Sequence, residues 1–353
     1  MVSHNMSWVR YPSQGGDHNA EDVVHSDTVI AKLMHIYIAL FVLTGLLAGI
    51  IILGIFIKNC MHHALKELDA VIFAHTVSNI ALILLSFTVT ARPDYLRVSY
   101  FECGTLSFFF NLSYFSSQYL RVLMVLSIFF SRHPPQNALI SKAYRNVTVF
   151  IGLVLMCALC ATLIVTAMLG AVNNHEVTDC QLDPLFAWPE YEIIKFTLGF
   201  CIPSLAKLFF FIRLLVKKTH TEIDHSRQSF TPYLTVFAIS ITMVICRLFY
   251  NVMLLYRALL KLHRSVGTVQ TELTTNIAEI MLFSESCLSL LIILFLHKTC
   301  RRGLLRIANK IAKVCGRRDG TNTFEIREFH TEVSSVPSEN ESHLNLDFRN
   351  TSN

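Results

Sequence analysis

Seven long apolar stretches constrain the fold of this chain more than any other feature of its sequence. They cover residues 33–57, 70–90, 104–130, 147–171, 192–216, 233–256 and 273–296. A helix needs about 20 largely apolar residues to cross the hydrocarbon core of a bilayer, and hydrophobic residues make up 53% of the chain. The sequence therefore predicts an all-α membrane protein, a seven-transmembrane helix bundle that spans residues 33–296.

Lysine and arginine beside the stretches predict how the bundle is oriented. The segments after the first, third, fifth and seventh stretches are basic, whereas residues 1–32 hold only Arg10 and Lys32. Cytoplasmic loops carry the excess of these residues, so residues 1–32 are expected to be an extracellular N-terminal segment. A glycosylation sequon at Asn5 fits that placement. We expect a multi-pass protein of the plasma membrane.

The chain after the seventh stretch falls into two parts. Residues 297–316 are basic and amphipathic, which predicts a juxtamembrane helix at the lipid surface. Cys300 and especially Cys315 are candidate palmitoylation sites there. Residues 317–353 are polar and rich in Ser, Thr and Glu, so we expect a disordered cytoplasmic tail that arrestin can bind after phosphorylation.

This topology places two of the ten cysteines where they can meet an oxidising compartment. Cys103 lies at the outer end of the third stretch, and Cys180 lies in the loop between the fourth and fifth. Disulfides form and persist outside the cytosol, and this one would hold the loop over the mouth of the bundle. We therefore expect a Cys103–Cys180 disulfide.

Short motifs in the third, fifth, sixth and seventh stretches share a pattern with a known family. They are Tyr114-Phe115-Ser116-Ser117, Phe200 followed by Pro203, Cys246-Arg247-Leu248-Phe249-Tyr250-Asn251, and Glu279 ten residues before Ser289. With the seven stretches and the cysteine pair, they make the chain resemble the rhodopsin-like (class A) G-protein-coupled receptors over about residues 30–315. The nearest branch is that of the chemokine and peptide receptors. The resemblance implies an extracellular ligand site, for which we select Glu279, Tyr250, Phe110 and Asp183.

The chain departs from that family at residues that carry its signal. The acidic-Arg-Tyr triplet at the end of the third helix would fall at Ser127-Ile128-Phe129, so the arginine that engages G protein is absent. In the sixth helix, Arg247 replaces the toggle tryptophan and Phe249 replaces the kink proline.

The family's sodium site is altered as well. Asn79 stands where the family has an aspartate, Ser289 stands where it has an asparagine, and Ser117 alone keeps a matching oxygen. A sodium ion needs a compensating charge in a medium of low dielectric. We expect it to bind weakly or not at all.

Arg121, Arg247 and Glu285 are predicted to lie inside the bilayer. Each such charge costs about 2.5–3.5 kcal/mol on insertion scales and usually faces a partner within the bundle. Helices six and seven are neighbours in the suspected fold, so we hypothesise an Arg247–Glu285 ion pair that acts as a structural clamp or as a switch. Arg121 is expected to bond to Asn79 or to backbone carbonyls.

Carboxylates dominate the segments predicted to lie outside. They are Asp17, Glu21, Asp22, Asp27, Glu176, Asp179, Asp183, Glu190 and Glu192. Such a surface would steer a cationic partner toward the bundle. A basic peptide or small basic protein is therefore the expected ligand, with Glu279 as the deeper anchor for its amine or guanidinium.

Three functions remain open on the sequence alone. The leading one is a receptor for an extracellular peptide, with G protein and arrestin as inner partners. The first alternative is a scavenger or decoy of the same fold that does not signal. The second is a small-solute transporter or channel, suggested by the embedded His75, Lys195 and Lys207. No catalytic constellation is present, and we expect no enzymatic activity, cofactor, metal site or nucleic-acid partner.

Overall fold

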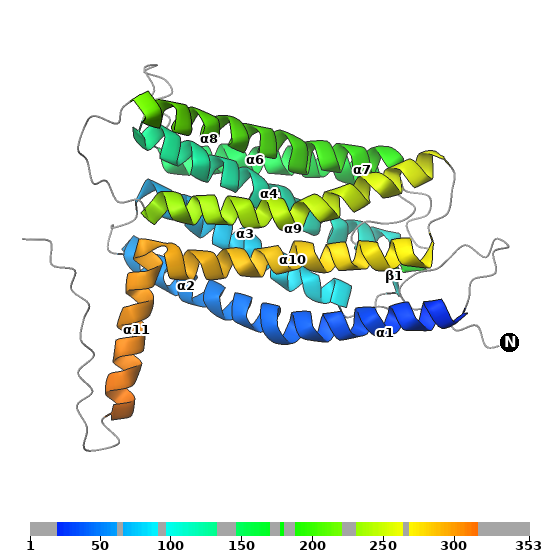
Figure 1. Ribbon diagram of the computed structural model, residues 1–353, viewed down its shortest axis with the longest axis horizontal. Helices are drawn as coiled ribbons and strands as arrows, with labels where there is room; N and C mark the ends of the chain where they lie inside the picture. The colour runs from blue at the N-terminus through cyan, green and yellow to red at the C-terminus, as the bar shows by residue number, and fades with distance from the viewer. Residues whose placement is uncertain are drawn as a thin grey trace, which may run out of the picture. The chain divides into compact units, whose positions relative to one another are not determined.

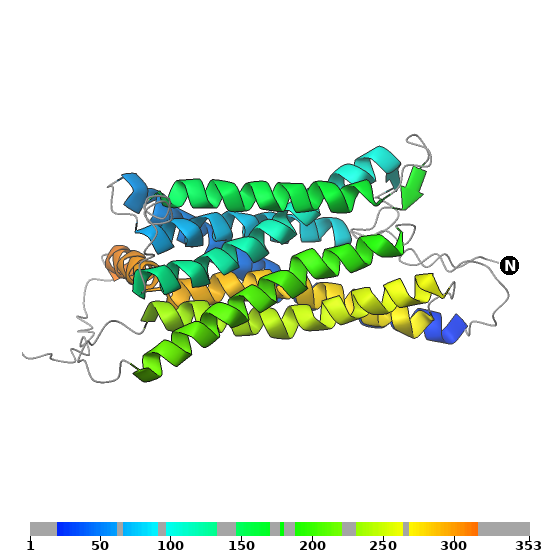
Figure 2. The same cartoon turned by 90° about the horizontal axis from the view of Figure 1, so that it is seen from above.

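The computed structural model is a helical bundle with the seven spans that the hydropathy pattern predicts (Figures 1 and 2). It describes residues 20–61, 66–90, 97–132, 146–169, 177–179, 188–220, 231–263 and 268–316. Its helices are α1 (Ala20–Ile36), η1 (Tyr37–Val42), α2 (Leu43–Met61), α3 (Glu67–Thr90), α4 (Tyr100–Arg132), α6 (Val147–Ala167), α7 (Pro189–Phe196), η2 (Thr197–Cys201), α8 (Ile202–His220), α9 (Thr231–Leu262), α10 (Val269–Leu296) and α11 (Lys298–Gly316). The expected fold class is confirmed.

The first span is one continuous helical run, α1–η1–α2, and it begins earlier than its apolar stretch. We expected residues 1–32 to precede the helix, but α1 begins at Ala20. A helix satisfies its backbone hydrogen bonds internally, so polar residues can extend it beyond the part that needs an apolar environment. Hydropathy marks the membrane-spanning part of such a helix and not its ends.

The outward faces of the helices are apolar. Leu47 is 61% exposed on α2, Leu153 is 60% exposed on α6, and Leu205 is 60% exposed on α8. Contiguous exposed apolar surface of this extent is unusual for a protein in water and is what lipid chains require. The chain is a multi-pass membrane protein.

Helix α10 packs along α9 and against α2 and α3 (Figures 1 and 2). Small residues permit the contact with α2. A Cβ added to Gly45 would lie 2.9 Å from Sγ of Cys287, and one added to Gly49 would lie 3.2 Å from Cδ1 of Leu290. Glycines four residues apart let membrane helices approach closely, which brings α10 into the interior of the bundle.

Pro203 accounts for the π-helical turn in the fifth span. It lies at the start of α8 directly after η2 and is buried. Proline donates no backbone hydrogen bond and its ring crowds the carbonyl four residues earlier, which here belongs to Gly199. A π-turn is one way for a helix to accommodate this. Gly199 in turn packs against the ring of Tyr114 on α4.

A short antiparallel pair of strands lies at one end of the bundle and is the one addition to the all-helical expectation within the described residues. Strand β1 (Arg97–Ser99) pairs with β2 (Val177–Asp179), Val98 opposite Thr178. We call this end the strand end and the opposite one the α11 end.

Cys180 directly follows β2 but lies outside the described residues, so the Cys103–Cys180 bond remains a prediction. Asn5 and the tail from residue 317 also lie outside them.

A buried polar contact joins α3 to the beginning of α11. Oδ1 of Asp69 lies 2.8 Å from Nε2 of His297, and the hydroxyl of Thr299 donates to Oδ2 of Asp69 at 3.3 Å. The residue after Thr299, Cys300, is fully buried. Its burial, together with the nearby Asp69, raises the pKa of its thiol to about 12. A thiol that is both buried and protonated is a poor acylation site, which leaves Cys315 as the candidate for palmitoylation.

Alanine at Gly199 is expected to destabilise the protein by about 1–3 kcal/mol, the usual cost of overpacking, because the added methyl group would overlap the ring of Tyr114. Gly152→Ala is the matched control, since a Cβ there meets nothing within 4 Å and alanine favours the helix. Thermal unfolding of the purified protein in detergent gives both values. Equal melting temperatures for the two variants would contradict the packing described here.

Candidate functional site

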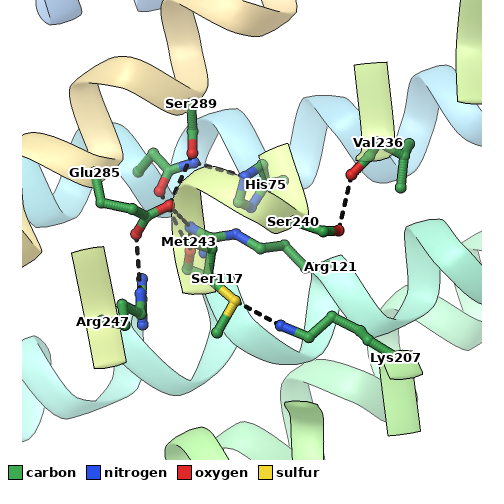
Figure 3. Close-up of polar contacts among 11 residues, drawn as sticks. His75, Ser117, Arg121, Lys207, Val236, Ser240, Met243, Arg247, Glu285 and Ser289 are labelled. Atoms are coloured by element: carbon green, nitrogen blue, oxygen red, sulfur yellow. Dashed lines mark hydrogen bonds and ion pairs between the residues drawn. The ribbon is translucent and has the colours of Figure 1, made fainter. Parts of the chain in front are cut away.

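Three charged side chains meet in the interior of the bundle and form what we call the charge cluster: Arg121, Arg247 and Glu285 (Figure 3). Nη2 of Arg121 lies 2.5 Å from Oε1 of Glu285, and Nε of Arg247 lies 2.9 Å from Oε2. All three are buried, with at most 1% of each side chain exposed. One carboxylate therefore bridges two guanidinium groups, one on each oxygen.

The cluster joins three helices, because Arg121 belongs to α4, Arg247 to α9 and Glu285 to α10. The Arg247–Glu285 contact hypothesised from the sequence is present. The expectation for Arg121 was wrong: its guanidinium contacts Glu285 and donates to Oγ of Ser117 at 2.9 Å, instead of bonding to Asn79 or to carbonyls. A carboxylate binds a buried cation more strongly than neutral acceptors do, so it decides the position of Arg121.

Neutral polar groups orient the cluster from three sides. Ser289, one turn further along α10, donates to Oε1 of Glu285 at 2.8 Å. The side-chain oxygen of Gln118, in the orientation that satisfies its amide, accepts from Nε of Arg247 at 2.9 Å and from Nη1. Asn251 donates to the carbonyl oxygen of Arg247 at 2.7 Å. Nothing in the sequence pattern distinguished Gln118, a neutral residue between two serines and a tyrosine.

The residues matched to the sodium site of the resembled family lie next to the charge cluster, and one of them, Ser117, contacts the guanidinium of Arg121. Ser117 donates to Oδ1 of Asn79 at 3.2 Å, and Nδ2 of Asn79 lies 2.8 Å from Nε2 of His75. Ser289 bonds to Glu285, as described above. Because Arg121 reaches both Ser117 and Glu285, a metal cation placed among these oxygens would meet a fixed positive charge.

A third basic side chain, Lys207, lies beside the cluster on α8. Nζ of Lys207 contacts Sδ of Met243 at 2.6 Å, and Met243 is one turn before Arg247 on α9 (Figure 3). Lys207 is only 3% exposed. A thioether accepts weakly and carries no charge, so Met243 provides no countercharge for Lys207.

An aromatic layer covers the cluster on the side of the strand end. The Nζ atom of Lys195 lies 4.6 Å from the ring centroid of Phe110, 5.3 Å from that of Tyr114, 5.6 Å from that of Tyr191 and 5.7 Å from that of Tyr250. Aromatic faces attract cations, most strongly where water is excluded. The sequence drew attention to Lys195 only as an embedded charge, since three of the four rings around it lie on α4 and α9, far from it in the sequence.

The structure brings two of the four selected ligand residues together, Phe110 and Tyr250, around Lys195. Glu279 lies on α10 and is 7% exposed, one turn before Phe283, whose ring centroid is 5.8 Å from that of Phe110. Asp183 lies outside the described residues. Glu279 thus lies one helical turn from a ring that packs against Phe110.

One of the carboxylates assigned to the acidic outer surface is not available to a ligand. Glu192 is fully buried, and its Oε1 lies 2.6 Å from Nζ of Lys261 and 3.4 Å from Nη2 of Arg257. Both bases lie near the end of α9, and they neutralise Glu192. Glu190 is exposed, as a steering charge has to be.

Comparisons with known proteins give one similarity, and it covers a third of the chain. No protein-family model matches it. Over 119 residues it is 29% identical to the C-X-C chemokine receptor type 2 of Bos taurus, a stretch that covers 33% of this chain and 32% of the relative. The chain thus aligns with about a third of that relative's length. With the seven apolar helices, this similarity supports a protein like the G-protein-coupled receptors.

Glu285→Gln is expected to be the most destabilising single change in the charge cluster. It leaves two buried guanidinium groups without a carboxylate, and breaking a buried pair costs about 3–5 kcal/mol. Arg121→Gln and Arg247→Gln each leave one arginine paired with Glu285 and should cost less. Thermal unfolding in detergent gives the ranking, and an arginine variant less stable than Glu285→Gln would contradict it.

Exchanging the charges of Arg247 and Glu285 is not expected to restore stability, although the pair is in contact. In the double variant Arg247→Glu, Glu285→Arg, the new guanidinium on α10 would lie against Arg121, and like charges repel in a medium of low dielectric. Adding Arg121→Leu removes that repulsion. The triple variant should therefore unfold at a higher temperature than the double; if it does not, Arg121 is not part of the cluster.

Proposed function

We propose that the chain is a rhodopsin-like receptor of the plasma membrane, with its N-terminus and strand end outside, that binds an extracellular basic peptide or small basic protein. The observation that carries this proposal is the direct contact between the aromatic layer and the charge cluster. The guanidinium carbon of Arg247 lies 4.7 Å from the ring centroid of Tyr114, which is itself part of the layer around Lys195.

This contact provides a physical route from ligand to helix movement. Tyr250 and Phe110 have ring centroids 6.4 Å and 6.2 Å from that of Tyr114. A ligand that displaces either ring would move Tyr114 and so change the surroundings of Arg247. Packed interiors switch between discrete arrangements rather than deforming smoothly, and the cluster joins the helices α4, α9 and α10 that would have to move.

The ligand's charge follows from Glu279 and from the acidic outer segments. Glu279 can form a charge-assisted hydrogen bond with an amine or guanidinium, and exposed carboxylates such as Glu190 would steer a cation toward it. The relative in Bos taurus bears the name of a chemokine receptor, which agrees with a protein or peptide ligand.

A scavenger that binds ligand without activating G protein is the second candidate, and the α11 end favours it. A cavity of about 270 Å³ there is lined by Lys66, Glu67, Leu68, Ser127, Ile128, Ser131 and Tyr233. Ser127 and Ile128 belong to the triplet that is matched to the acidic-Arg-Tyr motif of the resembled family, whose arginine contacts G protein. In a scavenger, the charge cluster would serve as a clamp.

The test is a binding and signalling assay on cells that display the whole chain. A panel of basic secreted peptides is screened for surface binding, and each binder is tested for G-protein activation and for uptake. Binding with activation supports a receptor, and binding with uptake alone supports the scavenger. If only neutral or acidic ligands bind, the proposed ligand class is wrong.

Glu279→Gln is expected to weaken binding of the identified peptide by about tenfold or more, because a hydrogen bond to a charged group contributes about 1.5–3 kcal/mol. Glu190→Gln is the matched control. It removes the same charge from an exposed position, so its effect should be small and should disappear at high salt. Equal losses in both variants at high salt would contradict the assignment of Glu279 as the anchor.

A further inference from the structure

The interior around the charge cluster holds more positive than negative charge. Arg121 and Arg247 share one carboxylate, that of Glu285, and Lys207 beside them contacts the uncharged thioether of Met243. In the next layer, Lys195 and Glu279 add one formal charge of each sign, so the excess is unchanged. Arginine is not deprotonated in proteins. At least one positive charge therefore remains in excess even if Lys207 is neutral.

Several donors of the two arginines have no acceptor. They are Nε and Nη1 of Arg121 and Nη2 of Arg247, all buried and without a hydrogen-bond partner in the structure. Buried donors are almost always paired, and an unpaired one costs free energy. The same two side chains thus lack both a full set of acceptors and a full countercharge.

We propose that the charge cluster is a binding site for a small monovalent inorganic anion, for which chloride is the physiological candidate. The anion accepts hydrogen bonds from the unpaired N–H groups of Arg121 and Arg247 and balances the excess charge. Water can satisfy such donors, but it cannot supply the missing negative charge, and an uncompensated charge in a buried site is costly.

The surroundings limit the ligand to a small ion. The cluster is buried to 1% exposure or less, and Tyr114, Tyr250 and Phe110 lie between it and the strand end. A peptide carboxylate would have to displace that layer to reach the arginines. A metal cation is disfavoured by Arg121, which reaches the oxygens of Ser117 and Glu285 itself.

The experiment uses the purified whole chain in a non-ionic detergent and needs no receptor ligand, so its outcome does not depend on the proposed function. Thermal unfolding is followed in sodium gluconate as chloride replaces gluconate at constant ionic strength. The expected result is a rise in melting temperature that grows with the logarithm of the chloride concentration and reaches about 3 °C at about ten times the dissociation constant. No difference between the two anions would overturn the proposal.

Arg247→Gln removes one unpaired donor and the excess arginine charge, and it should abolish the chloride dependence. Arg213→Gln is the matched control: Arg213 is an exposed arginine on α8, and its variant should keep the wild-type rise. An equal rise in Arg247→Gln would indicate a general salt effect and overturn the proposal.

A second measurement keeps the proposal testable if Arg247→Gln does not fold. Radioactive chloride is bound to the wild-type protein at equilibrium, with bromide and gluconate as competitors. One bound chloride per chain, displaced by bromide and not by gluconate, is expected. No bound chloride at concentrations that raise the melting temperature would overturn the proposal.

Discussion

The carboxylate of Glu285 is the group on which the interior of this bundle depends. It accepts from Arg121 on one oxygen and from Arg247 on the other, and so joins α4, α9 and α10 at one point. Such a contact adds little net stability when it forms, because three charges have lost their hydration. Its effect is on specificity, since any packing that separates these helices exposes an unpaired charge to a medium that cannot solvate it.

Two sets of side chains enclose the charge cluster, one polar and one aromatic. The charge cluster forms hydrogen bonds with the side chains of Ser289, Gln118 and Ser117. Aromatic rings separate it from the strand end and also stabilise the charge of Lys195. A site that the resembled family uses for a metal cation has the opposite electrostatic sign here. Ligand binding, helix movement and anion binding would all act on the same few side chains.

The sequence predicted the seven spans because hydropathy is a local property, summed over consecutive residues. It also predicted the Arg247–Glu285 contact, because two opposite charges at similar depth on neighbouring helices have few other partners. It misassigned Arg121, since a helix's rotation about its axis decides which neighbour a side chain meets. For the same reason Glu192 was counted as a surface charge, although Lys261 and Arg257 enclose it.

By itself, therefore, the sequence determined that this chain is a seven-helix membrane protein with charge buried inside it, because the cost of placing residues in lipid depends only on their type and depth. Only the tertiary structure decided that two arginines share one buried carboxylate. It also decided that aromatic rings enclose a lysine between this cluster and the strand end. Those contacts depend on the rotation and spacing of helices that are far apart in the sequence. Close packing at residues such as Gly45 and Gly199 fixes that rotation and spacing.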